Sequence, residues 1–170
     1  MPFAYYDRLS AARKRTYDRS DRILRIEWPD AKTLPPLALA VQAPLEAAER
    51  AATEKACQAL VDAMNAQLKT PPVKVRVLER RPSNNAGELQ GLYEPDEATG
   101  GVARITVWMR TARKEQVVKF RTFLRTLIHE VCHHLDYEHY KLAETFHTQG
   151  FYTRESALMR ELLGEAPAKV

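Results

Sequence analysis

The chain is poor in cysteine and has no long apolar run. Its 170 residues include only two cysteines, Cys57 and Cys132, both in segments with helical patterning, so free buried thiols and a reducing compartment are expected. No apolar run reaches ~18 residues, which argues against a transmembrane helix. The N-terminal residues lack an apolar segment after a basic start, so no signal peptide is predicted. These absences predict a cytoplasmic protein that does not enter the membrane.

Internal repeats, low-complexity tracts and a strong net charge are also absent. The formal net charge is +4, and the length suits one domain with a sizeable core. Basic residues are densest over 8–15, with Arg19, Arg22 and Arg25 following. Aspartates accompany them, as on a solvated helix face. Weak contact with nucleic acid through this helix is the alternative interpretation.

Hydrophobic periodicity predicts an α+β fold with N-terminal helices, a small mostly antiparallel sheet, a long helix and a C-terminal helix. Helices are expected over 5–18, 45–68, 115–137 and 152–163, strands over 73–78, 91–94 and 102–110, and a turn-rich loop over 81–87. Pro29, Pro35, Pro36 and Pro44 predict an extended connector. Residues 1–44 should therefore form a basic helix and a proline-rich connector that pack as one unit with a main domain, 45–170.

The segment His129-Glu130-Val131-Cys132-His133 lies within the predicted helix 115–137 and spells H-E-x-x-H. Residues four apart stack on one helix face, so the two imidazoles can bind one Zn²⁺ ion. Glu130 then lies beside the metal, where it can act as general base toward a zinc-activated water. Cys132 points toward the core and is not expected to be a ligand. Both histidines lie at the border of an apolar stripe on this helix. The stripe consists of Val117, Phe120, Leu124, Leu127, Ile128, Val131 and Leu135.

A small sheet, an H-E-x-x-H helix and a later histidine together resemble the zincin metallopeptidases. Within them, the motif followed by His147-Thr148-Gln149-Gly150-Phe151 is similar to the SprT-like group, in which a distant histidine precedes Gly and Phe. The resemblance covers residues 73–163; Gly150 lies three residues past His147, and no four-ligand zinc ribbon follows. It implies a zinc-dependent metallopeptidase acting on protein or peptide substrates, with Glu130 as catalytic base. The implied zinc ligands are His129, His133 and His147.

The third ligand has alternatives within the sequence. His147 agrees with the SprT-like pattern and precedes the predicted final helix. His139 lies six residues past His133, which matches the metzincin spacing H-E-x-x-H-x-x-G-x-x-H, although Asp136 stands where that motif has Gly. Glu144 or Glu155 would complete a set of two histidines and one glutamate. A site of this kind needs only one of them.

Other side chains near the motif have candidate supporting roles. Asp136 can accept the second ring N–H of a zinc-binding histidine. Tyr140, Tyr152 and Arg154 are candidates to stabilise an oxyanion. The strand 102–110, expected at a sheet edge, would bind substrate as an added antiparallel strand. The alternative functions are a non-proteolytic or single-target regulatory zincin-fold protein and a nucleic-acid-associated SprT-like protein. The sequence does not set the oligomeric state.

Overall fold

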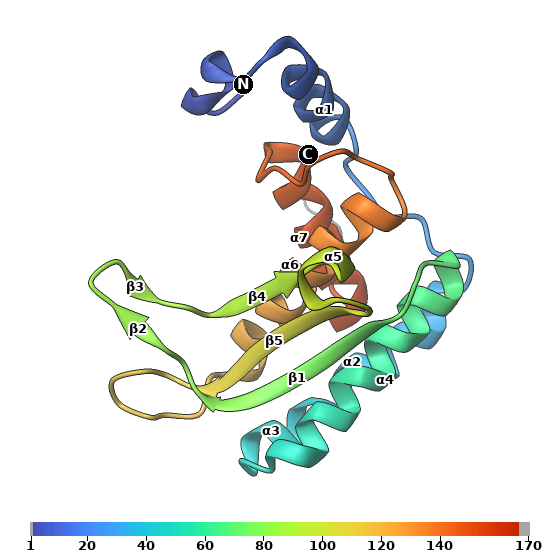
Figure 1. Ribbon diagram of the computed structural model, residues 1–170. Helices are drawn as coiled ribbons and strands as arrows, with labels where there is room; N and C mark the ends of the chain where they lie inside the picture. The colour runs from blue at the N-terminus through green and yellow to red at the C-terminus, as the bar shows by residue number, and fades with distance from the viewer. Residues whose placement is uncertain (1, 167–170) are drawn as a thin grey trace.

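A computed structural model describes residues 2–166 and has an α+β fold with a small mixed sheet (Figure 1). The strand order is β1-β5-β4, with β1 at Val73–Arg80, β5 at Ala103–Arg110 and β4 at Gly91–Glu94. β1 runs parallel to β5, and β4 runs antiparallel to it. The α+β prediction is confirmed. The expected mostly antiparallel sheet is wrong, because β1 pairs with β5 after the chain has reversed twice.

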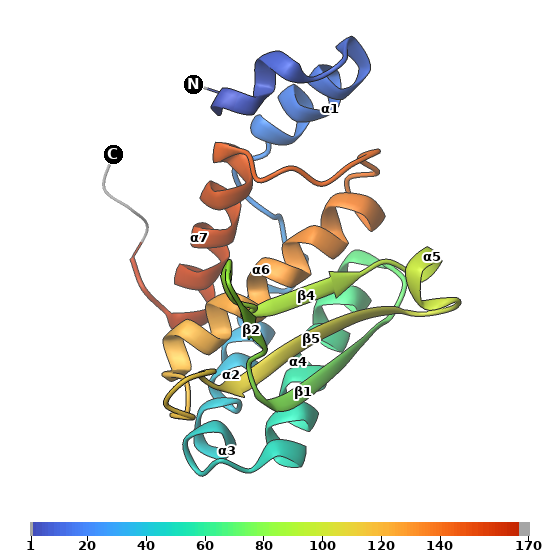
Figure 2. The same ribbon diagram turned by 60° about the vertical axis from the view of Figure 1, so that its left-hand side comes forward.

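Two long helices, α4 (Arg50–Leu68) and α6 (Phe120–Glu138), cover one face of the sheet (Figure 2). The helix α7 (Gln149–Leu163) packs against α6. Thr148 is its N-cap, and the Thr148 hydroxyl accepts a hydrogen bond from the Phe151 backbone N–H. Among residues 2–166, no helix has the length and apolar character that a bilayer crossing needs. The core between these layers includes Val75, Val77, Ile105, Val107, Leu124, Leu127, Ile128, Val131 and Leu135.

The two edges of the sheet differ in how their backbone groups are paired. Along β1, the Gln58 side chain of α4 donates to the Val73 carbonyl at 2.9 Å and accepts from the Val75 N–H at 2.8 Å. Glu54 accepts from the Val77 N–H at 3.0 Å. The outer edge of β4 pairs with no other strand in the described part of the chain. Side chains therefore block one edge of the sheet and leave the other open.

The N-terminal third is more helical than its prolines predict. The expected extended connector contains η2 (Ala31–Thr33), α2 (Leu34–Leu39) and α3 (Gln42–Glu46) instead. Pro35 and Pro36 fit the first turn of α2, because their missing N–H groups would have no intrahelical partner there. The expectation of an extended segment was therefore wrong. The helix predicted from residue 45 is also divided, at Ala48, whose φ is 56°.

Three other predicted boundaries change. The predicted helix 5–18 is η1 (Ala4–Arg8) followed by α1 (Ala11–Asp21), because Ser10 caps a new helix. Helix α6 begins five residues later than expected, since the Val118 N–H bonds to the Met109 carbonyl and continues the end of β5. The loop at 81–87 contains a short hairpin, β2 (Ser83–Asn84) with β3 (Gly87–Glu88), and the small helix α5 (Asp96–Thr99) joins β4 to β5.

Candidate metal centre

Three histidine side chains meet at the open edge of the sheet. His129 and His133 lie one turn apart on α6, and His147 lies in the segment that joins α6 to α7. Their Nε2 atoms form a triangle, with 3.2 Å between His129 and His133, 3.1 Å between His129 and His147, and 3.0 Å between His133 and His147. The three residues form a cluster that could hold a metal ion.

Hydrogen bonds at Nδ1 determine which ring nitrogen of two histidines is free. His129 Nδ1 lies 2.6 Å from a carboxylate oxygen of Glu155 and donates to it. His133 Nδ1 lies 2.7 Å from the Thr145 hydroxyl, which in turn donates to Asp136 at 2.7 Å. Because the single hydroxyl proton goes to Asp136, His133 Nδ1 must be the donor in the first bond. Both rings therefore direct an unprotonated Nε2 into the cluster.

The electrostatics of His133 favour the same neutral form. Burial, together with the nearby His129 and His147, lowers the pKa of His133 to about 3. Burial lowers the pKa of His147 as well, with His129 adding to this effect. Imidazole lone pairs directed at one point, as at His129 and His133, repel each other unless a cation lies between them. Tetrahedral coordination with bonds of ~2.05 Å would separate ligand nitrogens by about 3.3 Å, close to the separations found here, so the residues fit a metal ion.

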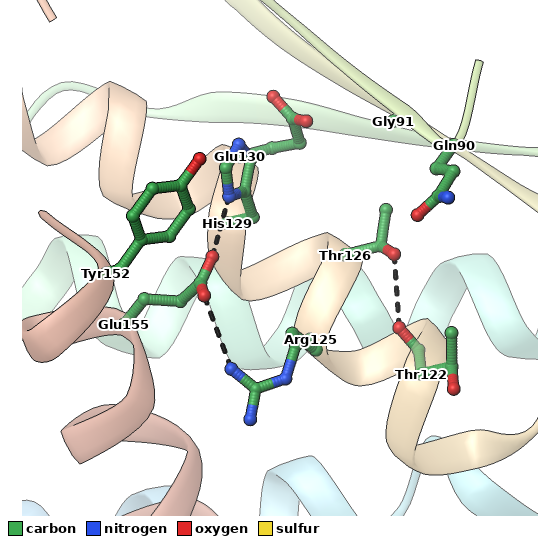
Figure 3. Close-up of a pocket in the computed structure, with 9 residues that line it drawn as sticks. All are labelled: Gln90, Gly91, Thr122, Arg125, Thr126, His129, Glu130, Tyr152 and Glu155. Atoms are coloured by element: carbon green, nitrogen blue, oxygen red, sulfur yellow. Dashed lines mark hydrogen bonds and ion pairs between the residues drawn. The ribbon is translucent and has the colours of Figure 1, made fainter. Parts of the chain in front are cut away.

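Glu130 lies beside His129 of the cluster and close to Gly91 of β4 (Figure 3). Its side chain is largely buried, with the residue 7% exposed. Burial raises the pKa of Glu130 to about 7; the charge of Glu155 acts in the same direction, and His129 opposes it. A carboxyl group with a pKa near neutrality is suited to accept and return a proton. Glu130 and His129 line a common cavity, so the carboxylate faces the space where a substrate would lie.

Two open cavities meet at His129 and Glu130 and follow β4. One has a volume of about 380 Å³. The other, of about 370 Å³, extends past His133 and His147 toward Tyr93 and Tyr137. Figure 3 shows the residues of the first cavity: Gln90, Gly91, Thr122, Arg125, Thr126, His129, Glu130, Tyr152 and Glu155. Together the cavities form a groove along the unpaired strand edge.

The structure distinguishes among the four candidates for the third metal ligand. His147 completes the cluster. His139 is the C-cap of α6 and packs on Tyr140, with ring centroids 4.7 Å apart, so the metzincin spacing does not bring it to the site. Glu144 forms an ion pair with Arg13 on the surface. Glu155 contacts His129 at Nδ1, the ring nitrogen that faces away from the cluster, and so orients that ring.

The other sequence candidates also have distinct positions. Asp136 was expected to accept directly from a zinc-binding histidine, but it reaches His133 through Thr145 instead. Arg154 is fully buried in a hydrogen-bonded pair with Asp136, and the Tyr140 hydroxyl points to the Arg25 carbonyl, so neither faces the cavity. Tyr152 is 41% exposed and lines the cavity beside His129. Of the three oxyanion candidates, only Tyr152 is in position.

Sequence reasoning missed Thr145 and the role of Gly91. Thr145 lies in an irregular segment, where no periodicity or motif distinguishes it from any other threonine. Gly91 is the first residue of an ordinary strand pattern, and its importance depends on how closely α6 approaches β4. Both residues act through contacts between segments far apart in the chain, which local patterns do not encode.

Comparisons with known proteins do not extend these observations. No protein-family model, no curated protein and no solved structure matches the chain. The geometry of the three histidines, Glu130 and the open edge of β4 is therefore the evidence for function.

Proposed function

We propose that the protein is a zinc-dependent metallopeptidase with a zincin-like site, similar to the SprT-like group. One observation carries this proposal: the Nε2 atoms of three histidines converge, with those of His129 and His133 unprotonated, beside a buried carboxyl group whose pKa is raised to about 7. A purely structural zinc site is normally closed by four protein ligands. Here the cluster has three and faces an open groove, as a catalytic site does.

Zinc is the metal that this donor set favours. Three neutral imidazoles suit Zn²⁺ better than Mg²⁺ or Ca²⁺, which prefer oxygen ligands. The outer partners Glu155 and Thr145 fix ring orientation, as is usual for zinc-binding histidines. Bound there, Zn²⁺ would supply Lewis-acid chemistry, making a water molecule nucleophilic near neutral pH and polarising a peptide carbonyl.

The residues of the chain supply the proton transfer and the positioning. Glu130 takes a proton from the attacking water and returns it to the leaving amine, because its raised pKa lies near the working pH. Tyr152 donates a hydrogen bond to the carbonyl oxygen as negative charge develops on it. Its hydroxyl suits this role because burial, with Glu155 adding to the effect, raises the pKa of Tyr152 and keeps the phenol protonated.

The substrate would bind as an extra strand on β4. The sequence placed this role on the strand 102–110, but β5 is the central strand and has partners on both sides. The open edge belongs to Gly91–Glu94, which borders both cavities beside the histidines. An extended peptide can pair its backbone with such an edge and so bring a carbonyl carbon over Glu130.

The test is metal content and cleavage measured on the same preparations. Protein stripped with a chelator and reconstituted with Zn²⁺ should bind about one ion per chain and cleave fluorescein-labelled casein. Glu130→Gln should keep the zinc and lose cleavage, whereas His147→Ala should lose both. His139→Ala is the matched control and should keep both. A wild-type protein that binds no zinc, or a Glu130→Gln variant that still cleaves, would contradict the proposal.

The alternative functions have less support. Several arginines of the basic N-terminal segment contact the protein itself: Arg13 pairs with Glu144, Arg19 donates to the Tyr140 carbonyl and Arg25 pairs with Glu161. Fewer charges are then available for phosphate groups. Nucleic-acid contact remains a prediction, which a steep salt dependence of DNA binding would support. A non-proteolytic zincin fold would have no need of Glu130.

A further inference from the structure

The segment that carries His147 has no regular structure of its own. Residues 139–148 join α6 to α7 without forming a helix or a strand, and they include both His147 and Thr145. No β-ladder holds this segment in place. Its position must therefore come from contacts with other parts of the fold.

The N-terminal helix supplies many of these contacts. Arg13 binds Glu144 through two hydrogen bonds of 2.6 and 2.7 Å, and Arg19 donates to the Tyr140 carbonyl at 2.6 Å. Tyr17 is 1% exposed, and its ring lies 5.8 Å from that of Phe146, the residue before His147. Helix α1 therefore holds the segment at its start, its middle and the position next to the ligand.

The C-terminal end of α1 connects to the centre by a second route. Arg154 donates to the carbonyls of Ser20 and Ile23, each at 2.9 Å, and so caps the end of α1. The same guanidinium donates to Asp136 at 2.8 Å. Asp136 accepts from Thr145, which accepts from His133. A continuous hydrogen-bonded path thus runs from the end of α1 to a second candidate ligand.

We infer that residues 4–21, which we name the N-terminal clamp, act as a positioning element for the metal centre. The clamp sets where His147 and Thr145 lie, and a metal ion at the three histidines holds the clamp against the rest of the protein in return. Coupling between two binding events is reciprocal, so each must strengthen the other by the same factor. The inference rests on the metal centre of the proposed function, and it gives the basic N-terminal helix a role within that centre.

Gly150 provides a selective way to loosen the clamp. A Cβ atom at this position would lie 2.3 Å from the Asp21 carbonyl oxygen and 2.6 Å from its carbon, both backbone atoms. The Gly150 N–H also donates to the Asp21 carboxylate at 2.8 Å. Gly150→Ala would push α1 away from α7 without altering a histidine. Gly101→Ala is the matched control, since a Cβ there meets nothing within 4 Å.

The experiment measures zinc affinity and backbone protection. Zn²⁺ dissociation constants come from competition with a chromophoric chelator, and hydrogen exchange is followed with and without Zn²⁺. In the wild type, Zn²⁺ should slow exchange in both the clamp and 139–148. Gly150→Ala should weaken Zn²⁺ binding by at least about 10-fold and remove that protection from the clamp, while Gly101→Ala should behave like the wild type.

A second variant keeps the test decisive if Gly150→Ala does not fold. Arg13→Ala combined with Arg19→Ala removes two exposed contacts to 139–148 and should weaken Zn²⁺ binding several-fold. Arg22→Ala, whose side chain bonds within its own helix to the Asp18 carbonyl, should not. If the wild type binds Zn²⁺ and the variants bind it equally tightly, the inference about the clamp is overturned, while the proposed function is not. A wild type that binds no Zn²⁺ overturns the inference and the proposed function together.

Discussion

Gly91 of β4 lies so close to Glu130 of α6 that residue 91 cannot carry a side chain without moving the carboxylate. A Cβ atom there would lie 2.9 Å from Glu130 Oε1 and 2.8 Å from the Thr126 methyl group. Both are ends of flexible side chains, so the backbone can remain in place while Glu130 turns. The missing side chain of Gly91 therefore helps to define the position of the proposed base.

Gly91→Ala should keep the zinc and lose much of the activity. General base catalysis contributes at least about 100-fold, so displacing the Glu130 carboxylate should lower kcat by about 10-fold or more. Metal analysis and casein cleavage on the same preparation check this, with Gly101→Ala as control. A Gly91→Ala protein with the kcat of the wild type would show that Glu130 tolerates a shifted position.

Glu130 should make the metal-free protein less stable as the pH rises. Its pKa in the folded state is raised from 4.5 to about 7, so the folded protein holds this proton more tightly than the unfolded chain does. The associated stability is present in full below the unfolded pKa and is lost as the pH rises through about 7. In the chelator-treated protein, Glu130→Gln should therefore gain stability relative to wild type between about pH 5 and about pH 8, by roughly 2 kcal/mol.

Urea denaturation at the two pH values measures this difference. Glu27→Gln, which changes an exposed glutamate, is the control. Equal pH dependence in the wild type and in Glu130→Gln would mean that the carboxyl group is better solvated than its burial indicates.

Tyr152→Phe should lower kcat without altering zinc content. The phenol lines the cavity beside His129 and Glu130, and loss of a single donor to a developing oxyanion typically costs about 100-fold in kcat. KM should change little, because the hydrogen bond strengthens only as charge develops. Steady-state kinetics on a peptide from the casein digest test this. Unchanged zinc content in the same preparation is the control for an intact metal centre. Full activity in Tyr152→Phe would remove the tyrosine from the mechanism.

Gln58→Leu should destabilise the protein and promote self-association. The variant leaves the Val73 carbonyl and the Val75 N–H of β1 without their side-chain partner, at a cost of about 1–2 kcal/mol. It also exposes a strand edge that can pair with a second chain. Chemical denaturation and light scattering measure the two effects. Lys55→Leu adds the same side chain at an exposed position of α4, and equal behaviour of the two variants would contradict this role for Gln58.

The sequence predicted the parts of the site that a single helix determines. The spacing of His129 and His133 depends only on helical geometry, and the apolar stripe of α6 indicated which face is buried. The α+β class and the pairing of 91–94 with the following strand were also predicted, because alternation and turn residues are local signals.

The remaining features depend on contacts between distant segments. The parallel pairing of β1 with β5 joins residues about thirty positions apart, for example Val75 and Ile105, so no local pattern encodes it. Prolines suggested an extended connector, yet Pro35 and Pro36 occupy the first turn of the short helix α2, where the missing N–H has no cost. Thr145 contacts His133 from an irregular segment twelve positions further along the chain, where no local pattern marks it.

Because the edge of β1 is blocked and the edge of β4 is open, a peptide can add to the sheet only along the groove beside β4. Strand pairing uses backbone groups, which every polypeptide has, so it discriminates little among amino-acid sequences. A segment of a folded domain whose backbone groups are already paired on both sides has no free edge to offer. Under the proposed function, selection would therefore act on conformational state: extended, unpaired segments such as unfolded regions and loose termini would enter the groove more readily than segments already held inside a sheet.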